Sequence, residues 1–165
     1  MEIVNGERLV LGTCYYPEHW DESLWRDDLR RMLENGIEVI RIAEFAWSKI
    51  ERYEGVFNYD FFDRFLDAAA EMGMKVIFCT PTATPPAWLT EKYPEVLNAT
   101  MDGVLYRHGG RRHYNYNSPK YQELTRIIVE KSASHYAKHP AIIGWQIDNE
   151  INCEKNEFYS ESDTI

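Results

Sequence analysis

Short apolar runs alternate with longer amphipathic segments along most of the chain. The apolar runs predict strands at Leu9–Tyr16, Ile37–Ala43, Lys75–Thr80 and from Ile142 onward. The amphipathic segments carry apolar residues at helical spacing and predict helices over Ser23–Glu34, Tyr59–Met72 and from Ser118 to about Ala137. Strands that alternate with helices in this way are typical of parallel βα units.

Glycines mark the ends of the first two predicted helices. Asn35-Gly36 follows one helix and Gly73 follows the other, because glycine readily adopts the left-handed conformation that ends many helices. The long segment from Pro81 to about Asn117 is rich in turn residues, and we predict a loop there. Aromatic side chains at regular spacing predict the core: Trp25, Phe57, Phe61, Phe62 and Phe65.

The repeated βα pattern predicts an α/β fold. Four βα units without a visible linker make the first half of a (β/α)8 TIM barrel, since a complete barrel typically needs about 250 residues. The chain has 165 residues, and its polar tail from Asn152 to Ile165 carries no fifth strand. We interpret residues 1–165 as the truncated N-terminal half of one barrel domain, with no second domain. Because the first and last strands would lack partners, we expect the isolated chain to be poorly soluble or self-associated.

Composition and charge exclude several classes of partner. The chain carries 18 Lys and Arg against 27 Asp and Glu, for a formal net charge of −9, which argues against nucleic acid as a partner. No apolar run reaches the roughly 18 residues of a membrane span, and the first residues lack the pattern of a signal peptide. The cysteines, Cys14, Cys79 and Cys153, are widely spaced and odd in number, which favours a reducing compartment. We predict a cytoplasmic protein that binds neither nucleic acid nor membranes.

The run from Ile142 to Glu150, IIGWQIDNE, is the most informative stretch for function. An apolar strand ends there in Asp148, Asn149 and Glu150. Because the active site of a βα barrel lies at the C-terminal ends of its strands, Glu150 is the first candidate for a catalytic group. Carboxylates, amides and aromatic rings at the strand ends suit a carbohydrate. Hydrolysis of a glycosidic bond needs two carboxyl groups, and the residues alone nominate Glu44 together with Glu150.

Five motifs carry a resemblance to a known family. They are YYPEHW at 15–20, RIAEFAWSKIE at 41–51, TPTATPPAWL at 80–89, GGRRHY at 109–114 and DNE at 148–150. In this order, and over nearly all of the 165 residues, the chain resembles glycoside hydrolase family 42, most of whose members are β-galactosidases. The TPTATPP segment is far more specific than the widespread Asn-Glu pair.

The resemblance implies retaining hydrolysis of terminal non-reducing β-D-galactose in a TIM barrel. Glu150 matches the general acid/base, Asn149 the residue that binds the hydroxyl next to the anomeric carbon, and Arg111 a substrate-binding arginine. Glu44 then holds sugar hydroxyls or orients its neighbours. The nucleophilic glutamate of the family lies beyond Ile165, so we expect the isolated chain to be inactive. The resemblance also implies that the full-length protein forms trimers.

The same resemblance raises the question of zinc, because many family members carry a structural zinc site of four cysteines. One of these cysteines follows the GRRHY motif, where this chain has Asn115, and only Cys153 stands in the region of the others. A closed tetrahedral zinc site needs four ligands, usually Cys or His. We predict no zinc and no cofactor.

Simpler interpretations of the charged candidates remain open. A glutamate at a strand end is more often a solvated rim or cap residue than a catalyst, although the surrounding motif favours catalysis for Glu150. Glu44 can equally pair with Arg41 or another buried cation. Arg111 and Arg112 can form an ordinary solvated pair.

The aromatic and histidine candidates also have two interpretations. Trp47 and Trp88 suit a sugar platform, and packing explains them equally well. His135 and His139 have the i, i+4 spacing of zinc ligands on a helix, but no HExxH pattern accompanies them, so we interpret them as surface or cap residues. For the whole chain, the alternatives to a β-galactosidase are an inactive or carbohydrate-binding remnant and another retaining β-glycosidase of the same clan.

Overall fold

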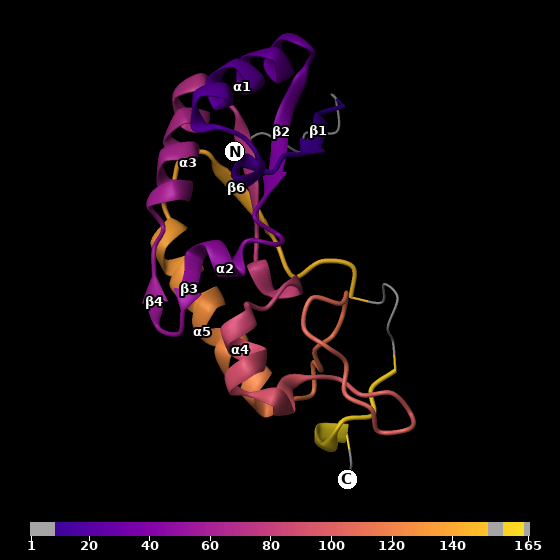
Figure 1. Ribbon diagram of the computed structural model, residues 1–165. Coiled ribbons are helices and arrows are strands. Elements are labelled where there is room, and N and C mark those ends of the chain that lie inside the picture. The colour runs from indigo at the N-terminus through magenta and orange to yellow at the C-terminus, as the bar shows by residue number, and fades with distance from the viewer. Residues whose placement is uncertain (1–8, 152–156, 164–165) are drawn as a thin grey trace. The chain divides into compact units, whose positions relative to one another are not determined.

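The computed structural model describes residues 9–151 and 157–163, which form two compact units. One unit contains residues up to 43 together with 59–79 and 138–146, and the other contains 44–58, 80–137 and the residues from 147 on. Each unit therefore joins segments that are far apart in the sequence (Figure 1). Cys153 and its neighbours in 152–156 lie outside the described residues, as do residues 1–8 and 164–165.

The first unit holds a four-stranded parallel sheet in the order β1-β2-β5-β6. The strands are β1 (Leu11–Cys14), β2 (Ile37–Ile42), β5 (Lys75–Cys79) and β6 (Ile142–Gln146). Neighbours in the sheet are also consecutive in the βα pattern, and the register pairs Ile40 with Val76. The fold class predicted from the sequence, with four parallel βα units, is confirmed.

Two amphipathic helices of this unit pack on each other and on the sheet. Helix α1 (Trp25–Glu34) contacts α3 (Asp60–Met72) and β2, and α3 contacts β5. The Trp25 ring meets Phe65 edge-on at 5.2 Å between centroids, and Phe62 meets Phe78 in the same way at 5.7 Å. Burial of each such side chain stabilises the fold by about 1.5–3 kcal/mol. The predicted core is confirmed for Trp25, Phe62 and Phe65, whereas Phe57 and Phe61 are half-buried.

The outer strands of the sheet are open within the described residues. Strand β1 pairs only with β2 and β6 only with β5, as the half-barrel interpretation predicts. Every residue of β1 is exposed, including Leu11. Such edges present unpaired backbone groups to further strands.

The second unit consists of short elements and one long helix. They are α2 (Trp47–Ile50), the hairpin strands β3 (Glu51–Tyr53) and β4 (Val56–Phe57), α4 (Ala87–Lys92) and α5 (Pro119–Tyr136). Helix α5 begins with Pro119, which needs no N–H partner at that position, and the Ser118 hydroxyl accepts the N–H of Tyr121 at 3.4 Å. Among the described residues, every helix is too short or too polar to span a bilayer.

The long segment predicted as a loop carries more structure than expected. It contains α4, the 3₁₀ turns Pro81–Ala83 and Pro94–Val96, and antiparallel bridges that pair Leu97 with Tyr114 and Ala99 with Leu105. Isolated bridges leave no alternating apolar run in the sequence, which explains why the pattern did not reveal them.

Candidate active site

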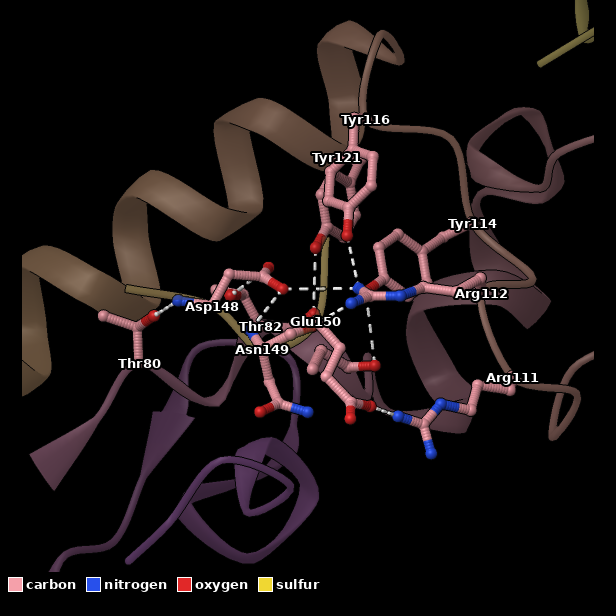
Figure 2. Close-up of polar contacts among 11 residues, drawn as sticks. Thr80, Thr82, Arg111, Arg112, Tyr114, Tyr116, Tyr121, Asp148, Asn149 and Glu150 are labelled. Atoms are coloured by element: carbon pink, nitrogen blue, oxygen red, sulfur yellow. Dashed lines mark hydrogen bonds and ion pairs between the residues drawn. The ribbon is translucent and has the colours of Figure 1, made fainter. Parts of the chain in front are cut away.

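Two buried threonines hold the Asp148–Glu150 segment. Thr80 directly follows β5, and its hydroxyl oxygen accepts the backbone N–H of Asp148 at 2.7 Å. Thr82 donates its hydroxyl hydrogen to Asp148 Oδ2, also at 2.7 Å (Figure 2). Both threonines are almost fully buried, so water does not compete for these bonds. The TPT and DNE motifs, 66 residues apart between Thr82 and Asp148, therefore form one local structure.

Arg112 binds the same segment from the opposite side. Its guanidinium donates to Asp148 Oδ1 at 3.3 Å, to the Asn149 carbonyl oxygen, and to the hydroxyls of Tyr114 and Tyr116 (Figure 2). Only 4% of Arg112 is exposed. A buried cation requires such partners, because an unpaired charge in a protein interior is very costly. The interpretation of Arg111 and Arg112 as a solvated pair is therefore wrong for Arg112.

Three tyrosines, which we call the tyrosine cluster, surround this arginine. Tyr114 stacks on Tyr121 at 4.7 Å between ring centroids, and Tyr116 meets both rings edge-on. Burial raises the pKa of all three tyrosines, so their hydroxyls stay neutral. Burial opposes the charge on Arg112, but Tyr114, Tyr116 and Asp148 outweigh it and raise the pKa of Arg112. Arg112 is therefore a permanent cation beside Asp148.

Alternation along residues 112–117 separates two groups of polar contacts. Arg112, Tyr114 and Tyr116 meet at the Asp148 side, whereas Asn115 and Asn117 bind the segment 157–163. The contacts alternate from one residue to the next, although residues 111–112 and 116–117 lie in turns. This alternation is visible in the sequence RHYNYN and is the signal that could have identified Arg112 as a site residue.

Three residues of the site have backbone torsions that are unusual for residues other than glycine. Arg112, Asp148 and Glu150 have φ values of +56°, +54° and +48°. A side chain in this left-handed region costs about 1–2 kcal/mol relative to the right-handed conformation. Strained residues of this kind concentrate at functional sites, where surrounding contacts hold them.

Arg111 and Glu150 form an ion pair at the edge of this structure (Figure 2). Their side chains are 44% and 51% exposed, so both groups are accessible to a ligand. Arg111 and Asn149 also line a pocket of about 260 Å³. The remaining lining residues are Phe45, Ala83, Thr84, Pro85, His108, Gly109, Gly110, Arg112 and His113. The structure thus places Arg111 against Glu150 and, with Asn149, beside this pocket.

One of the residues that line this pocket is a neutral histidine. His113 is 5% exposed, and its Nδ1 lies 2.6 Å from the Gly110 carbonyl oxygen, to which it donates a hydrogen bond. Burial lowers the pKa of His113, and the neighbouring His108 ring, 4.8 Å away, acts in the same direction. His113 is therefore neutral near pH 7.

The other predicted sugar contacts lie elsewhere in the second unit. Glu44 is fully buried, and the described residues that line the pocket include Phe45 but not Glu44. Trp47 is also fully buried and donates its indole N–H to Glu51 Oε2 at 2.8 Å, so packing rather than a sugar platform explains it. Trp88 is half-buried and donates to the Glu51 carbonyl oxygen at 3.0 Å.

The structure corrects the spacing argument for the two histidines. Helix α5 ends at Tyr136, so His135 lies in its last turn and His139 lies beyond it. His139 Nδ1 accepts the backbone N–H of Ala141 at 3.3 Å, and Nε2 lies 3.4 Å from Asp67. The described part of the chain contains no group of three or more His, Cys, Asp or Glu residues that could hold a metal.

Asn115, where the resemblance implies a zinc-binding cysteine in many family members, is engaged in hydrogen bonds instead. It is fully buried, and its Nδ2 donates to Ser160 Oγ and to Asp163 Oδ2, both at 2.5 Å. Its Oδ1 accepts the backbone N–H of Asn117 at 2.8 Å. A neutral amide whose atoms are used in this way does not fit a zinc centre.

Comparison with known proteins decides the family. The model of glycoside hydrolase family 42, described as "Beta-galactosidase", matches residues 14–164. The chain belongs to glycoside hydrolase family 42. The β-galactosidase BgaA of Thermus sp. is 46% identical over 144 residues, which are 87% of this chain and 22% of that protein. The β-galactosidase Bga of Halorubrum lacusprofundi is 42% identical over 145 residues, or 88% of this chain and 21% of the relative.

Solved structures of this family agree with the fold. The crystal structure of the β-galactosidase from the psychrophilic Marinomonas ef1 matches with a TM-score of 0.90 and 42% identity, over 93% of this chain and 24% of that one. Gan42B, a family 42 β-galactosidase, matches with a TM-score of 0.81 and 35% identity, over 86% of this chain and 21% of that one. This family 42 chain therefore spans between a fifth and a quarter of the length of the proteins it matches.

Proposed function

We propose that the protein is a retaining β-galactosidase in which Glu150 is the general acid/base. The observation that carries this proposal is the meeting of Glu150, Asn149 and Arg111 beside one pocket. Membership of family 42 supports the galactoside as substrate. The 165 residues then belong to the N-terminal half of a TIM-barrel catalytic domain.

In the first step, Glu150 protonates the glycosidic oxygen while a carboxylate nucleophile attacks the anomeric carbon and the bond to the leaving alcohol breaks. In the second step, Glu150 removes a proton from water, whose oxygen attacks the anomeric carbon and displaces the nucleophile. We assign the nucleophile to a residue beyond Ile165. Full burial of Glu44, away from the pocket lining, fits a supporting role better than nucleophilic attack.

Asn149 and Arg111 hold the sugar in this proposal. The Asn149 amide can both donate to and accept from the hydroxyl beside the anomeric carbon. Arg111 has only donors and would bind a second hydroxyl oxygen of the galactose. Since Arg111 is paired with Glu150 in the free chain, sugar binding must draw Arg111 away so that Glu150 can carry the proton it donates.

The test is hydrolysis of 4-nitrophenyl β-galactoside by the protein expressed from its complete reading frame. Removal of a general acid/base typically costs 10²- to 10⁴-fold, so we expect Glu150→Gln to lose about that much of kcat/KM. Glu91→Gln, an exposed residue of α4, is the matched control and should keep full activity. An aryl glucoside and an aryl mannoside distinguish a β-galactosidase from other retaining enzymes. Absence of turnover on all three would instead favour an inactive or carbohydrate-binding protein.

Three further properties follow from the same proposal. The isolated chain of residues 1–165 lacks the nucleophile, so it should not turn over the galactoside even though it carries Glu150. The full-length protein should be a trimer, which light scattering after size-exclusion chromatography can measure. It should act in the cytoplasm, which fractionation of the source cells can test.

A further inference from the structure

We propose that Arg112 is a positioning residue that fixes the turn 148–150 and thereby aims Glu150. This inference rests on the proposed role of Glu150. It concerns the second arginine of the GRRHY motif, whose side chain is buried and does not need to touch the sugar. Figure 2 shows the two arginines pointing to different targets, Arg112 to the Asp148–Asn149 segment and Arg111 to Glu150.

Arg112 completes the hydrogen bonding of the residue that precedes Glu150. The backbone N–H of Asn149 donates to Asp148 Oδ1 at 2.6 Å, and its carbonyl oxygen accepts from Arg112. The same guanidinium also binds Asp148 Oδ1. Both backbone groups of Asn149 are therefore held through the Arg112–Asp148 pair, and the peptide that leads into Glu150 has a defined orientation.

The opposite side of the turn is held by the threonines. Asp148 Oδ2 accepts from Thr82, and the Asp148 N–H donates to Thr80. Tyr121 donates its hydroxyl hydrogen to the Thr82 carbonyl oxygen at 2.9 Å, which fixes the threonine in turn. Asp148 thus lies between Thr82, which donates to Oδ2, and Arg112, which donates to Oδ1. Loss of Thr82 removes this donor from Oδ2, and loss of Arg112 leaves Oδ1 with the Asn149 N–H.

Backbone strain explains why the turn needs this support. Asp148 and Glu150 both have φ near +50°, a region that a residue with a side chain leaves readily when its contacts are lost. A change of φ at Glu150 to the right-handed region would swing its carboxyl group away from the pocket edge. The contacts of Arg112 offset that tendency, because they are made to the two residues immediately before Glu150.

A lysine cannot replace this guanidinium. Nη1 of Arg112 donates to Tyr114, Tyr116 and Asp148, while Nη2 donates to the Asn149 carbonyl oxygen. The planar fork reaches acceptors on both of its arms, whereas lysine offers a single nitrogen. Arg112→Lys therefore preserves the charge and removes the geometry, which makes it the informative variant.

The experiment compares leaving groups in the protein expressed from its complete reading frame. A misplaced general acid slows a substrate that needs protonation, such as phenyl β-galactoside, and has little effect on 2,4-dinitrophenyl β-galactoside, whose leaving group departs unprotonated. We expect Arg112→Lys to lower kcat/KM about 10²-fold for phenyl β-galactoside, because general acid catalysis contributes at least about 10²-fold. For 2,4-dinitrophenyl β-galactoside we expect a loss of less than about 10-fold. Azide, a nucleophile that needs no general base, should raise the turnover of the dinitrophenyl substrate by the variant and form galactosyl azide.

Matched variants separate positioning from folding. Thr82→Val removes the donor on the other side of Asp148 and should give the same dependence on the leaving group in weaker form. Arg126→Lys, on an exposed part of α5, and Thr100→Val, whose hydroxyl accepts the Val104 N–H at 3.2 Å, should behave as wild type. If Arg112→Lys does not fold, Thr82→Val carries the same test.

The outcomes distinguish this inference from the proposed function. An equal loss on both substrates without azide rescue would mean that Arg112 only keeps the protein folded, and would overturn the inference while leaving Glu150 as acid/base. Wild-type protein without activity on any aryl galactoside would overturn both. The loss of kcat/KM could also depend on the leaving group in Glu150→Gln and not in Arg112→Lys or Thr82→Val. That result would refute the positioning role of Arg112 and leave the proposed role of Glu150 intact.

Discussion

The side-chain amide of Asn115 lies 2.5 Å from the carboxylate of Asp163. This bond belongs to a set of contacts, here called the polar clasp, by which Asn98, Asn115 and Asn117 hold residues 157–163. Asn115 is its buried centre. Because loss of a buried partner leaves other polar groups unsatisfied, we expect Asn115→Ala to lower the free energy of unfolding by about 1–3 kcal/mol.

Urea denaturation of the purified protein measures this effect. Asn117→Ala is the natural comparison, because its bond to Asp163 Oδ1 at 2.6 Å is exposed and water can replace it. A loss at Asn117 as large as that at Asn115 would contradict the view that burial makes the clasp effective.

The polar clasp also leads to a prediction about metal. Asn115 uses its amide for hydrogen bonds to Ser160 and Asp163, and the described residues offer no cluster of metal ligands around it. We therefore expect the purified protein to contain no stoichiometric zinc by elemental analysis. Dialysis against a chelator should leave its melting temperature unchanged. Close to one zinc per chain, with a lower melting temperature after chelation, would refute this.

His113 should make stability depend on pH. Its pKa in the folded chain is lowered by burial, so the unfolded chain binds a proton more readily. The neutral ring contributes its full stability above the ordinary histidine pKa of about 6.5. This contribution is lost as the pH falls through the lower pKa of the folded state, and the free energy of unfolding then changes by at most about 1.4 kcal/mol per pH unit. We expect His113→Gln to remove this contribution to the pH dependence of the free energy of unfolding.

The comparison requires unfolding free energies between pH 5 and pH 8 for wild type and variant. His135→Gln, at an exposed position in the last turn of α5, is the control and should keep the wild-type slope. Parallel curves for wild type and His113→Gln would show that His113 titrates alike in both states.

The repeating elements of the fold were predictable because each buries one face. The strands β2 and β5 are largely apolar runs, and α3 carries apolar residues at helical spacing. The observed bounds of these elements differ from the predicted ones by few residues. The hairpin β3–β4 and helix α4 were not predicted, because elements of two to six residues are too short to show a period.

The site was predictable where a motif ended a strand and not where contacts joined distant segments. Glu150 lies shortly after the end of β6, so its position nominated it, whereas Asn149 and Arg111 were nominated by the resemblance. Arg112 depends on Asp148 and on tyrosines that fold back across the loop. The Arg-Arg pair alone does not indicate which side chain is buried, and only the alternation in RHYNYN does so. Trp47 was ambiguous because an indole suits a core and a sugar surface equally well, and only its full burial decided between them.

Trp47 gives a last prediction that concerns a buried carboxyl group. Glu51 accepts hydrogen bonds from the Trp47 indole and from the Gly55 N–H at 2.8 Å each, yet burial still raises the pKa of Glu51. Its ionised form is therefore less stable in the folded chain, and this destabilisation appears as the pH rises above the ordinary glutamate value. Trp47→Phe keeps an aromatic ring but removes one donor to the carboxylate. We expect it to lower the free energy of unfolding by about 1–3 kcal/mol at pH 7 and by clearly less near pH 4.5.

Trp88→Phe is the control, since the Trp88 indole donates to the Glu51 carbonyl oxygen and not to the carboxylate, and its effect should not change with pH. Equal losses for Trp47→Phe at the two pH values, measured by urea denaturation, would mean that the indole does not stabilise the charge on Glu51.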